Sequence, residues 1–147
     1  MKGYLLDTSV VSIIAPGKPA PPEPLSDWLR QRADHLFVPV IALAEIEAGI
    51  GKLRRAGGSA RADQLSRWLD ALVQGYGERV LPLEASSARA AGRLSNAATA
   101  AGRNPGFPDV AIAAIASVHE FVVLTRNVRH FASLGVEYAD PLAALPS

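Results

Sequence analysis

The sequence predicts an α/β fold with a central parallel sheet of about four to five strands and helices on both faces. The first observation behind this prediction is that short apolar segments, typical of buried strands, alternate with longer amphipathic segments, typical of helices. Such an alternation favours a parallel sheet with right-handed crossovers. The second observation is that 147 residues, 49% hydrophobic and 20% charged, suit one globular domain. We therefore expect a single domain over residues 1–147.

The first strand and the first helix meet at a carboxylate. The apolar run Tyr4–Leu6 suits a strand that is covered on both faces, and Asp7 interrupts it. Thr8 and Ser9 then offer N-cap chemistry for a helix that begins near Val10. In open α/β sheets such a junction lies at the carboxyl edge of the strands, where ligands bind. Taken alone, the aspartate could equally be no more than a helix cap.

The second strand follows a proline-rich stretch. Residues 15–24 contain five prolines and predict a loop, and residues 26–33 predict a short helix. Residues 36–38 are the second predicted strand. Pro39 fits the first turn of a long helix that Gly57 and Gly58 end, since glycine is frequent directly after a helix.

The rest of the chain continues the same alternation. Pro82 would disrupt a central strand, so we expect the third strand at an edge of the sheet. The most apolar helix follows the loop at residues 102–106, and the alanine-rich helix before that loop can pack closely against a neighbour. The remaining predicted elements are helices over residues 59–74, 84–101, 108–119 and 128–133, and strands over residues 79–83, 121–124 and 135–138.

Composition and charge exclude several classes of protein. The chain has no cysteine, which excludes disulfides, thiolate chemistry and cysteine-based zinc sites. No uncharged run approaches the length of a membrane span, and the N-terminus has no signal-like apolar region because Asp7 breaks it. The net charge of +1 gives no global basic field. We expect a soluble cytoplasmic protein with no membrane association.

Basic residues are nevertheless concentrated in one segment and one small cluster. Such groups are more often a solvated helix face than a binding surface. The segment contains Asp63 as its only acid, and the cluster follows the fourth predicted strand. The basic residues are Lys52, Arg54, Arg55, Arg61 and Arg67 in the segment, and Arg126 and Arg129 in the cluster.

Four polar side chains should meet at the carboxyl edge of the sheet. Asp7 follows the first strand, Glu45 lies in the second turn of the helix after the second strand, Asp109 begins the apolar helix, and Asn127 follows the fourth strand. Carboxylates in apolar surroundings are costly unless they are paired or bind a metal. Three carboxylates at one edge repel each other, and a divalent cation relieves this repulsion. Oxygen ligands suit Mg²⁺ or Mn²⁺ and not zinc.

Each of these residues also has a purely structural alternative. Asp109 could only complement a helix dipole, Glu45 could be a solvated helix residue, and Asn127 could form a turn. Glu47 lies about 200° around the helix from Glu45, so both cannot face one site, and we assign Glu47 to solvent. The three histidines show no metal-ligand spacing and are expected to be surface or core residues; they are His35, His119 and His130.

Four stretches of the chain together resemble a known family. They are LLDTSVV at residues 5–11, AEIEAG at 44–49, PDVAIAAIA at 108–116 and VLTRNVRHF at 123–131. In this order they resemble the PIN-domain endoribonuclease toxins, the VapC family of type II toxin–antitoxin modules. The resemblance covers nearly the whole chain. It implies a PIN fold, Mg²⁺- or Mn²⁺-dependent cleavage of RNA, a homodimer and a neutralising antitoxin as partner.

The resemblance also implies roles for individual residues. The acidic positions of the family fall on Asp7, Glu45 and Asp109, and the E-I-x-x-G pattern favours Glu45 over Glu47. The fourth position, often aspartate in the family, is Asn127 here, which would bind the cation through water or orient the substrate. Asp7 and Asp109 would be the main metal ligands and Glu45 a ligand or a water-orienting base. The residues implied on the substrate side are Thr8 and Ser9, as hydroxyl donors, and Arg126, which with the basic segment 52–67 would hold the RNA backbone.

Other enzymes with an aspartate after the first strand fit less well. Haloacid-dehalogenase-type phosphatases need a second aspartate two residues later, where this chain has Ser9, and a receiver domain needs an additional acidic pair. The chain has neither a glycine-rich phosphate loop nor a G-x-S-x-G nucleophile turn. The alternative from a different class is a noncatalytic RNA- or protein-binding regulatory module with the same fold. Metal-dependent RNA cleavage distinguishes the nuclease from this module.

Overall fold

The computed structural model describes residues 2–147 and has a five-stranded parallel sheet at its centre. The strand order is β3-β2-β1-β4-β5, so β1 lies in the middle and pairs with β2 and β4. The predicted parallel sheet, with β3 at an edge, is thus confirmed. The strands are β1 (Tyr4–Leu6), β2 (Leu36–Pro39), β3 (Val80–Leu81), β4 (Val122–Leu124) and β5 (Tyr138–Ala139).

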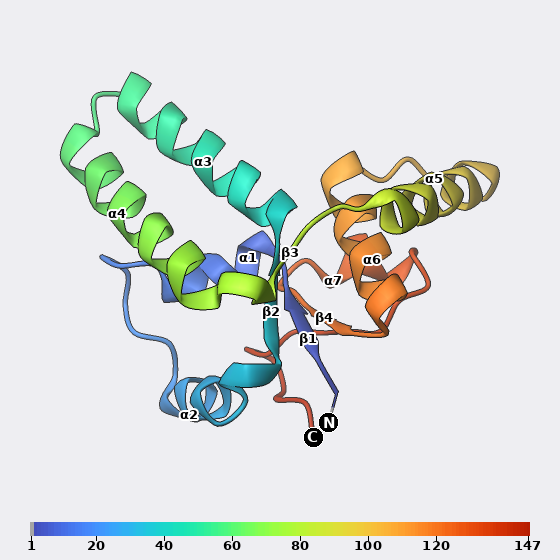
Figure 1. Ribbon diagram of the computed structural model, residues 1–147, viewed down its shortest axis with the longest axis horizontal. Coiled ribbons are helices and arrows are strands. Elements are labelled where there is room, and N and C mark those ends of the chain that lie inside the picture. Colours follow the sequence, from blue (N-terminus) through green and yellow to red (C-terminus); the bar gives the residue numbers. More distant parts are fainter. Residues whose placement is uncertain (1) are drawn as a thin grey trace.

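Seven α-helices surround the sheet in the described chain (Figure 1). They are α1 (Thr8–Val11), α2 (Glu23–Gln31), α3 (Val40–Arg55), α4 (Ser59–Tyr76), α5 (Ala85–Ala100), α6 (Phe107–His119) and α7 (Val128–Ala132). Short 3₁₀ turns at Ser12–Ile14, Ala33–His35 and Gly77–Arg79 join some of these elements. None of the helices in residues 2–147 combines the length and the apolar character that crossing a membrane would require.

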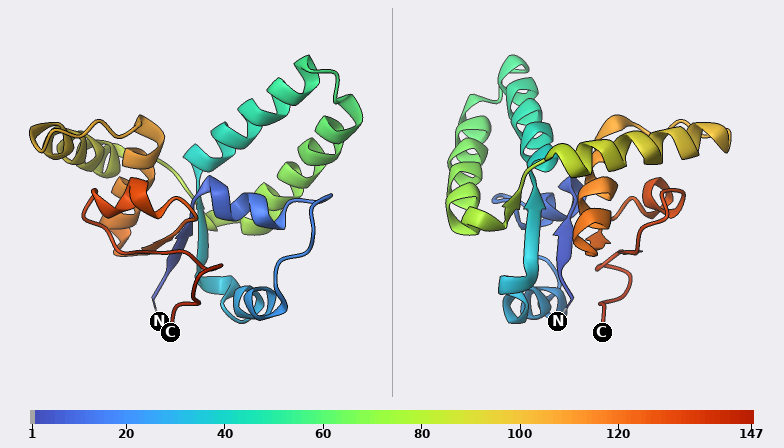
Figure 2. Two further views of the ribbon diagram at one scale, coloured as in Figure 1. Left: turned by 180° about the vertical axis from the view of Figure 1, so that it is seen from behind. Right: turned by 45° about the vertical axis from the view of Figure 1, so that its right-hand side comes forward.

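The two faces of the sheet are covered by different helices, because successive side chains of a strand point to opposite faces. Leu5 and Val123 belong to a core that they share with α5, α6 and α7. Tyr4, Leu6 and Leu124 belong to the opposite core, to which α1, α2, α3 and α4 contribute. Figure 2 shows the two groups of helices on either side of the strands. The prediction of helices on both faces is therefore confirmed.

Helices α3 and α4 form a hairpin that projects beyond the sheet (Figure 1). A separate small core of Ile50, Ala62 and Leu69 holds its outer part together. The turn between the helices contains Gly57, whose φ of +92° is a conformation that glycine adopts readily. The start of α3, which carries Glu45, lies at the carboxyl end of β2, whereas the turn lies at the far end of the hairpin.

Several element boundaries differ from the sequence prediction. Helix α1 begins at Thr8 and not near Val10, because Asp7 and not Thr8 or Ser9 is its cap. Helix α2 begins at Glu23 and not at residue 26, with Pro24 in its first turn, where a missing N–H is harmless. Pro39 ends β2 and precedes α3 instead of lying in its first turn.

The later boundaries differ for similar local reasons. Helix α4 continues through Gly75 to Tyr76 and ends at Gly77, which has a φ of +54°. The strand predicted over residues 79–83 is only Val80–Leu81. The last strand lies at Tyr138–Ala139 and not at residues 135–138, since it is the pairing of Tyr138 with Val123 of β4 that defines it.

Candidate metal and catalytic site

Asp7 is the most deeply buried of the predicted site residues. It lies directly after β1, only 3% exposed, and its backbone N–H donates to the carbonyl oxygen of Leu124 on β4 at 3.0 Å. Its Oδ1 caps α1 by accepting from the backbone N–H of Val10 at 3.2 Å and also accepts from the Ser9 hydroxyl at 2.5 Å. Its Oδ2 accepts from the Thr125 hydroxyl at 2.6 Å. The cap role is therefore real, but it uses only one of the two carboxylate oxygens.

The charge of Asp7 has no cationic partner among residues 2–147. No Lys, Arg or His of the described chain forms an ion pair with it. Burial raises the pKa of the Asp7 carboxyl above its usual value, although the hydrogen bonds from Ser9, Thr125 and Val10 lower it in part. The ionised carboxylate is thus held in a poorly solvated position with hydroxyl donors alone, an arrangement that a bound cation would stabilise.

A hydrogen-bond network connects Asp7 to the loop between β4 and α7. The Thr125 hydroxyl, fully buried, donates to Asp7 and accepts from the backbone N–H of Asn127 at 2.9 Å. The Ser9 hydroxyl likewise donates to Asp7 and accepts from the backbone N–H of Arg126 at 3.0 Å. Two hydroxyls therefore fix the position of this loop relative to the aspartate, and with it the starting points of the Arg126 and Asn127 side chains.

Glu45 lies beside the same junction on the neighbouring unit. Its Oε1 accepts from the Thr8 hydroxyl at 2.5 Å, so that the residue after Asp7 connects β1 to α3. Glu45 is exposed and Thr8 is half-buried. This contact agrees with the choice of Glu45 as the residue of its helix that turns toward the sheet edge.

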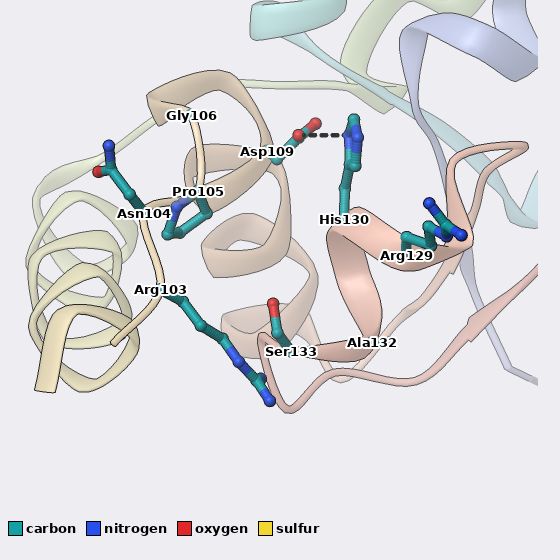
Figure 3. Close-up of a pocket in the computed structure, with 9 residues that line it drawn as sticks. All are labelled: Arg103, Asn104, Pro105, Gly106, Asp109, Arg129, His130, Ala132 and Ser133. Carbon is teal, nitrogen blue, oxygen red and sulfur yellow. Dashed lines mark ion pairs between the residues drawn. The ribbon is translucent and has the colours of Figure 1, made fainter. Parts of the chain in front are cut away.

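Asp109 lies in the first turn of α6 and contacts a histidine. Its Oδ2 is 2.9 Å from Nδ1 of His130 on α7, and the Asp109 side chain is 25% exposed. Figure 3 shows the two side chains facing each other at the rim of a cleft of about 630 Å³, together with Arg103 and Arg129. Sequence reasoning assigned His130 to the surface or the core, and its contact with Asp109 was missed.

The three predicted ligands do not form a ready-made metal site in this arrangement. Among residues 2–147, no three Asp, Glu or His side chains are grouped closely enough to hold an ion. Each of the three carboxylates contacts a different side chain of the protein. Asp7 accepts a hydrogen bond from Thr125 and Glu45 accepts one from Thr8, while Asp109 pairs with His130. The donor chemistry still fits Mg²⁺ or Mn²⁺, because these are carboxylate oxygens and the buried Asp7 charge is uncompensated. The assignment of the metal ligands stays a prediction.

The remaining predicted site residues lie in two places, one beside Asp7 and one on the α3–α4 hairpin. Arg126 and Asn127 are exposed and stand in the loop that Thr125 and Ser9 fix. The basic segment 52–67 instead occupies the outer part of the α3–α4 hairpin. Within it, Arg54 pairs with Asp63 at 2.6 Å, and Arg61 binds the Pro16 carbonyl and Gln64.

Thr125 is the site residue that sequence reasoning missed most clearly. The sequence predicts no role for it, yet it is completely buried, and its hydroxyl forms two hydrogen bonds within the site. A threonine directly after an apolar strand, at the same sheet edge as Asp7, was the available signal. The signal is weak, because threonine is common in and around strands.

The chain is similar to known proteins over most of its length. The model of the PIN domain matches residues 4–136. The chain is 33% identical over 142 residues to the plasmid stability protein StbB of Pseudomonas syringae pv. tomato, covering 95% of this chain and 99% of StbB. It is 28% identical over 138 residues to the VapC ribonuclease Y4jK of Sinorhizobium fredii, covering 93% and 96% of the two chains.

Two solved structures share the fold over almost their entire length. FitAcB from Neisseria gonorrhoeae matches with a TM-score of 0.80 and 26% identity, covering 94% of this chain and 97% of the other. DNA-bound VapBC from Salmonella typhimurium matches with a TM-score of 0.74 and 24% identity, covering 95% and 98%. At this level of identity the second likeness concerns the fold alone.

Proposed function

The chain belongs to the PIN-domain family, and from this premise we propose that it is a metal-dependent endoribonuclease, the toxin of a type II toxin–antitoxin module. The observation that carries the proposal is the buried Asp7 carboxylate without a cationic partner in the described chain, at the sheet edge where α3 and α6 begin. The similarity to a VapC ribonuclease over 93% of the chain supports RNA as the substrate. RNA as the substrate also implies the cytoplasm as the place of action.

The carboxylates supply the ligands of the proposed cofactor. Asp7 and Asp109 would hold Mg²⁺ or Mn²⁺, with Glu45 as a further ligand or as the base that orients a water. When bound, such a cation provides charge stabilisation and an acidified water for in-line attack on a phosphodiester. The same carboxylates repel the phosphates of RNA when they are free, so neutralising them would also strengthen substrate binding.

The hydroxyl groups and Asn127 position these ligands and the substrate. Thr125 and Ser9 hold the two oxygens of Asp7 at 2.6 and 2.5 Å, and Thr8 holds Glu45 at 2.5 Å. The side chain of Asn127 is exposed, while its backbone is fixed by Thr125. From this position its amide would contact a cation through water or orient the RNA.

An antitoxin is the proposed protein partner, and an apolar groove offers a place for it. The groove has a volume of about 610 Å³ and lies between α1, α2 and α4, on the sheet face opposite α6. Ile14, Leu29 and Trp68 line it together with the exposed Ala71. An amphipathic segment would bury its apolar side chains here.

RNA cleavage in the presence and absence of divalent cations tests the proposal. Purified protein, free of antitoxin, should cut single-stranded RNA with Mg²⁺ or Mn²⁺ and stop when EDTA is added. Asp109→Asn should abolish cleavage while the protein stays folded by circular dichroism. If the wild-type protein binds RNA but never cuts it under any of these conditions, the noncatalytic binding module is the better description.

A further inference from the structure

Two clefts lie beside the proposed catalytic residues, and both are lined by basic side chains. The first, of about 630 Å³, contains Asp109 and His130 together with Arg103 and Arg129 (Figure 3). The second, of about 420 Å³, contains Ser9, Lys18 and Arg126 and no acid. Asp109 is the one acid that lines the first cleft. Positive charge therefore flanks the carboxylates on two sides of the β4–α7 segment.

The cations in these clefts are available for a ligand. Lys18, Arg103, Arg126 and Arg129 are all exposed, and no ion pair or side-chain hydrogen bond engages them among residues 2–147. Some other arginines do have such contacts. Arg79, for example, donates to the carbonyl oxygens of residues 33 and 36 at 2.7 and 2.8 Å and is part of the fold.

The two clefts share one segment of the chain, residues 126–130. One segment supplies both, since Arg126 lines the second cleft and Arg129 and His130 line the first. Ser9 in the second cleft donates to Asp7, while Asp109 belongs to the first. A linear ligand that occupied both clefts would therefore pass the two principal carboxylates.

We propose that the two clefts hold the backbone of a single-stranded RNA on the two sides of the scissile phosphodiester. Arg103 and Arg129 contact phosphates in one cleft, and Lys18 and Arg126 do so in the other. This inference rests on the proposed function and specifies how the substrate lies. Each cleft has the volume of a small-ligand pocket, which a flexible strand can enter and a rigid A-form duplex cannot.

The proposal differs from the expectation that segment 52–67 holds the RNA. That segment lies on the outer part of the α3–α4 hairpin, and Arg54 and Arg61 are occupied by contacts within the protein. Lys52, Arg55 and Arg67 are the basic members of the segment without such contacts in the described chain. The two hypotheses therefore make opposite predictions for substitutions in the clefts and in the hairpin.

The two hypotheses are distinguished by the salt dependence of RNA binding. Binding of a fluorescein-labelled single-stranded RNA is measured by anisotropy in EDTA. The variants are Arg103→Gln with Arg129→Gln, Lys18→Gln with Arg126→Gln, and Lys52→Gln with Arg67→Gln. Each phosphate contact to a single strand contributes a slope of about 0.7 in log K against log salt. Each cleft pair should therefore lower the slope by about 1.4 and the affinity at about 0.1 M salt by roughly 25-fold. The hairpin pair should change neither.

The hairpin pair matches the cleft pairs in charge, and Lys2→Gln is a further control that removes one positive charge at a distant position. Lys2 precedes β1 at the opposite end of the strand from Asp7, where it pairs with Glu137 at 2.7 Å on the surface. Its substitution should leave the slope unchanged. The salt dependence of kcat/KM for cleavage of the same RNA with Mg²⁺ provides a second measurement. Light scattering on every variant records the oligomeric state.

The possible outcomes separate this inference from the function on which it rests. If the wild-type protein cuts RNA but the cleft pairs leave the salt slope unchanged, the assignment of the clefts is wrong, whereas the proposed function is unaffected. A change of oligomeric state with an unchanged slope would assign the clefts to a protein interface and overturn it equally. Wild-type protein that neither binds nor cuts RNA would overturn the proposed function, and the inference with it.

Discussion

At the scale of single residues, Asp7 combines a structural and a proposed catalytic role. One oxygen caps α1, while the other binds the buried hydroxyl of Thr125. Its pKa is raised by burial, which means that the folded protein disfavours the charged form that a metal ligand requires. In the metal-free protein, the ionised form of this carboxyl is therefore less favourable to folding at neutral pH than the protonated form. Ionisable groups with a pKa shifted in this way are typical of functional sites.

Asp7→Asn separates the two roles, because asparagine caps a helix about as well as aspartate but carries no charge. We expect the metal-free variant to be at least as stable as the wild type at pH 7. Mg²⁺ at about 100 times its dissociation constant should stabilise the wild type by roughly 2.7 kcal/mol and the variant much less. Thermal unfolding with and without Mg²⁺ measures both. A variant that retains its Mg²⁺ response and its RNA cleavage would show that Asp7 is only a cap.

The pH dependence of stability gives a second test of Asp7. Its folded pKa is raised above the reference value of 3.8, so between these two values the folded state binds more protons than the unfolded state. The free energy of unfolding of the metal-free wild type therefore falls as pH rises through this window, relative to Asp7→Asn. Urea unfolding of both proteins from pH 3.8 upward checks the sign. A wild type that gained stability over the variant as pH rose would contradict it.

Thr125 is the residue whose hydroxyl the site depends on most. Thr125→Val keeps the shape but leaves Asp7 Oδ2 and the N–H of Asn127 without their partner. We expect a loss of about 1–3 kcal/mol in the free energy of unfolding, and reduced RNA cleavage beyond what the loss of folded protein explains. Thr125→Ser retains the hydroxyl and should restore most of the activity. Equal cleavage by the Val and Ser variants would show that the Thr125 hydroxyl has no role in the site.

At the scale of elements, the position of Asp109 depends on how α5 packs against α6. Helix α6 has Asp109 in its first turn and is buried along most of its length, with Ala113 and Ala114 completely inaccessible. Alanines Ala90 and Ala91 of α5 belong to the same core. Small side chains on both helices allow the backbones to approach closely, and any enlargement must displace one helix.

Ala114→Leu tests this packing. The larger side chain should destabilise the protein by about 1–3 kcal/mol and lower RNA cleavage, because the displaced α6 carries Asp109 with it. Ala97→Leu on the exposed side of α5 is the matched control and should change neither quantity. Chemical denaturation and initial cleavage rates measure the two effects. Equal stability of both variants would mean that this part of the core has room for a larger residue.

At the scale of the whole molecule, the described surface retains large apolar side chains. Phe107 at the start of α6 is 63% exposed, and Val118 near its end is 44% exposed. They lie near opposite ends of the helix, and Ala114, which falls between them on the same side, is fully buried, so they are two separate exposed positions. Exposed large apolar side chains at both ends of α6 offer surface for contact with a second copy.

We therefore expect a homodimer in solution. Light scattering of the antitoxin-free protein at micromolar concentration should give twice the mass of 15.5 kDa. Phe107→Ser with Val118→Ser should shift the equilibrium toward the monomer, because it removes apolar area that association would bury. Wild-type protein that remains monomeric throughout the micromolar range would exclude this interface.

The sequence by itself determined the architecture, because hydrophobic periodicity is a local property. The runs Tyr4–Leu6 and Val122–Leu124 are too short to be helices and are therefore predicted as strands. Their alternation with helical segments predicts a parallel sheet whose carboxyl edge lies at Asp7. Boundaries were less accurate where several local signals competed. The sequence offers Asp7, Thr8 and Ser9 as caps for the same helix, and geometry selected the aspartate.

Only the tertiary structure decided which side chains meet. Thr125 is 118 positions from Asp7, and its hydrogen bond exists because β1 and β4 are neighbours in a sheet whose order no local pattern encodes. The contact of His130 with Asp109 and the clefts that hold Lys18 and Arg103 have the same origin. Segment 52–67 shows the converse, because its charge density is evident in the sequence while its place on the outer hairpin is not. Contacts between distant residues follow from strand order and helix packing, which the whole chain sets together.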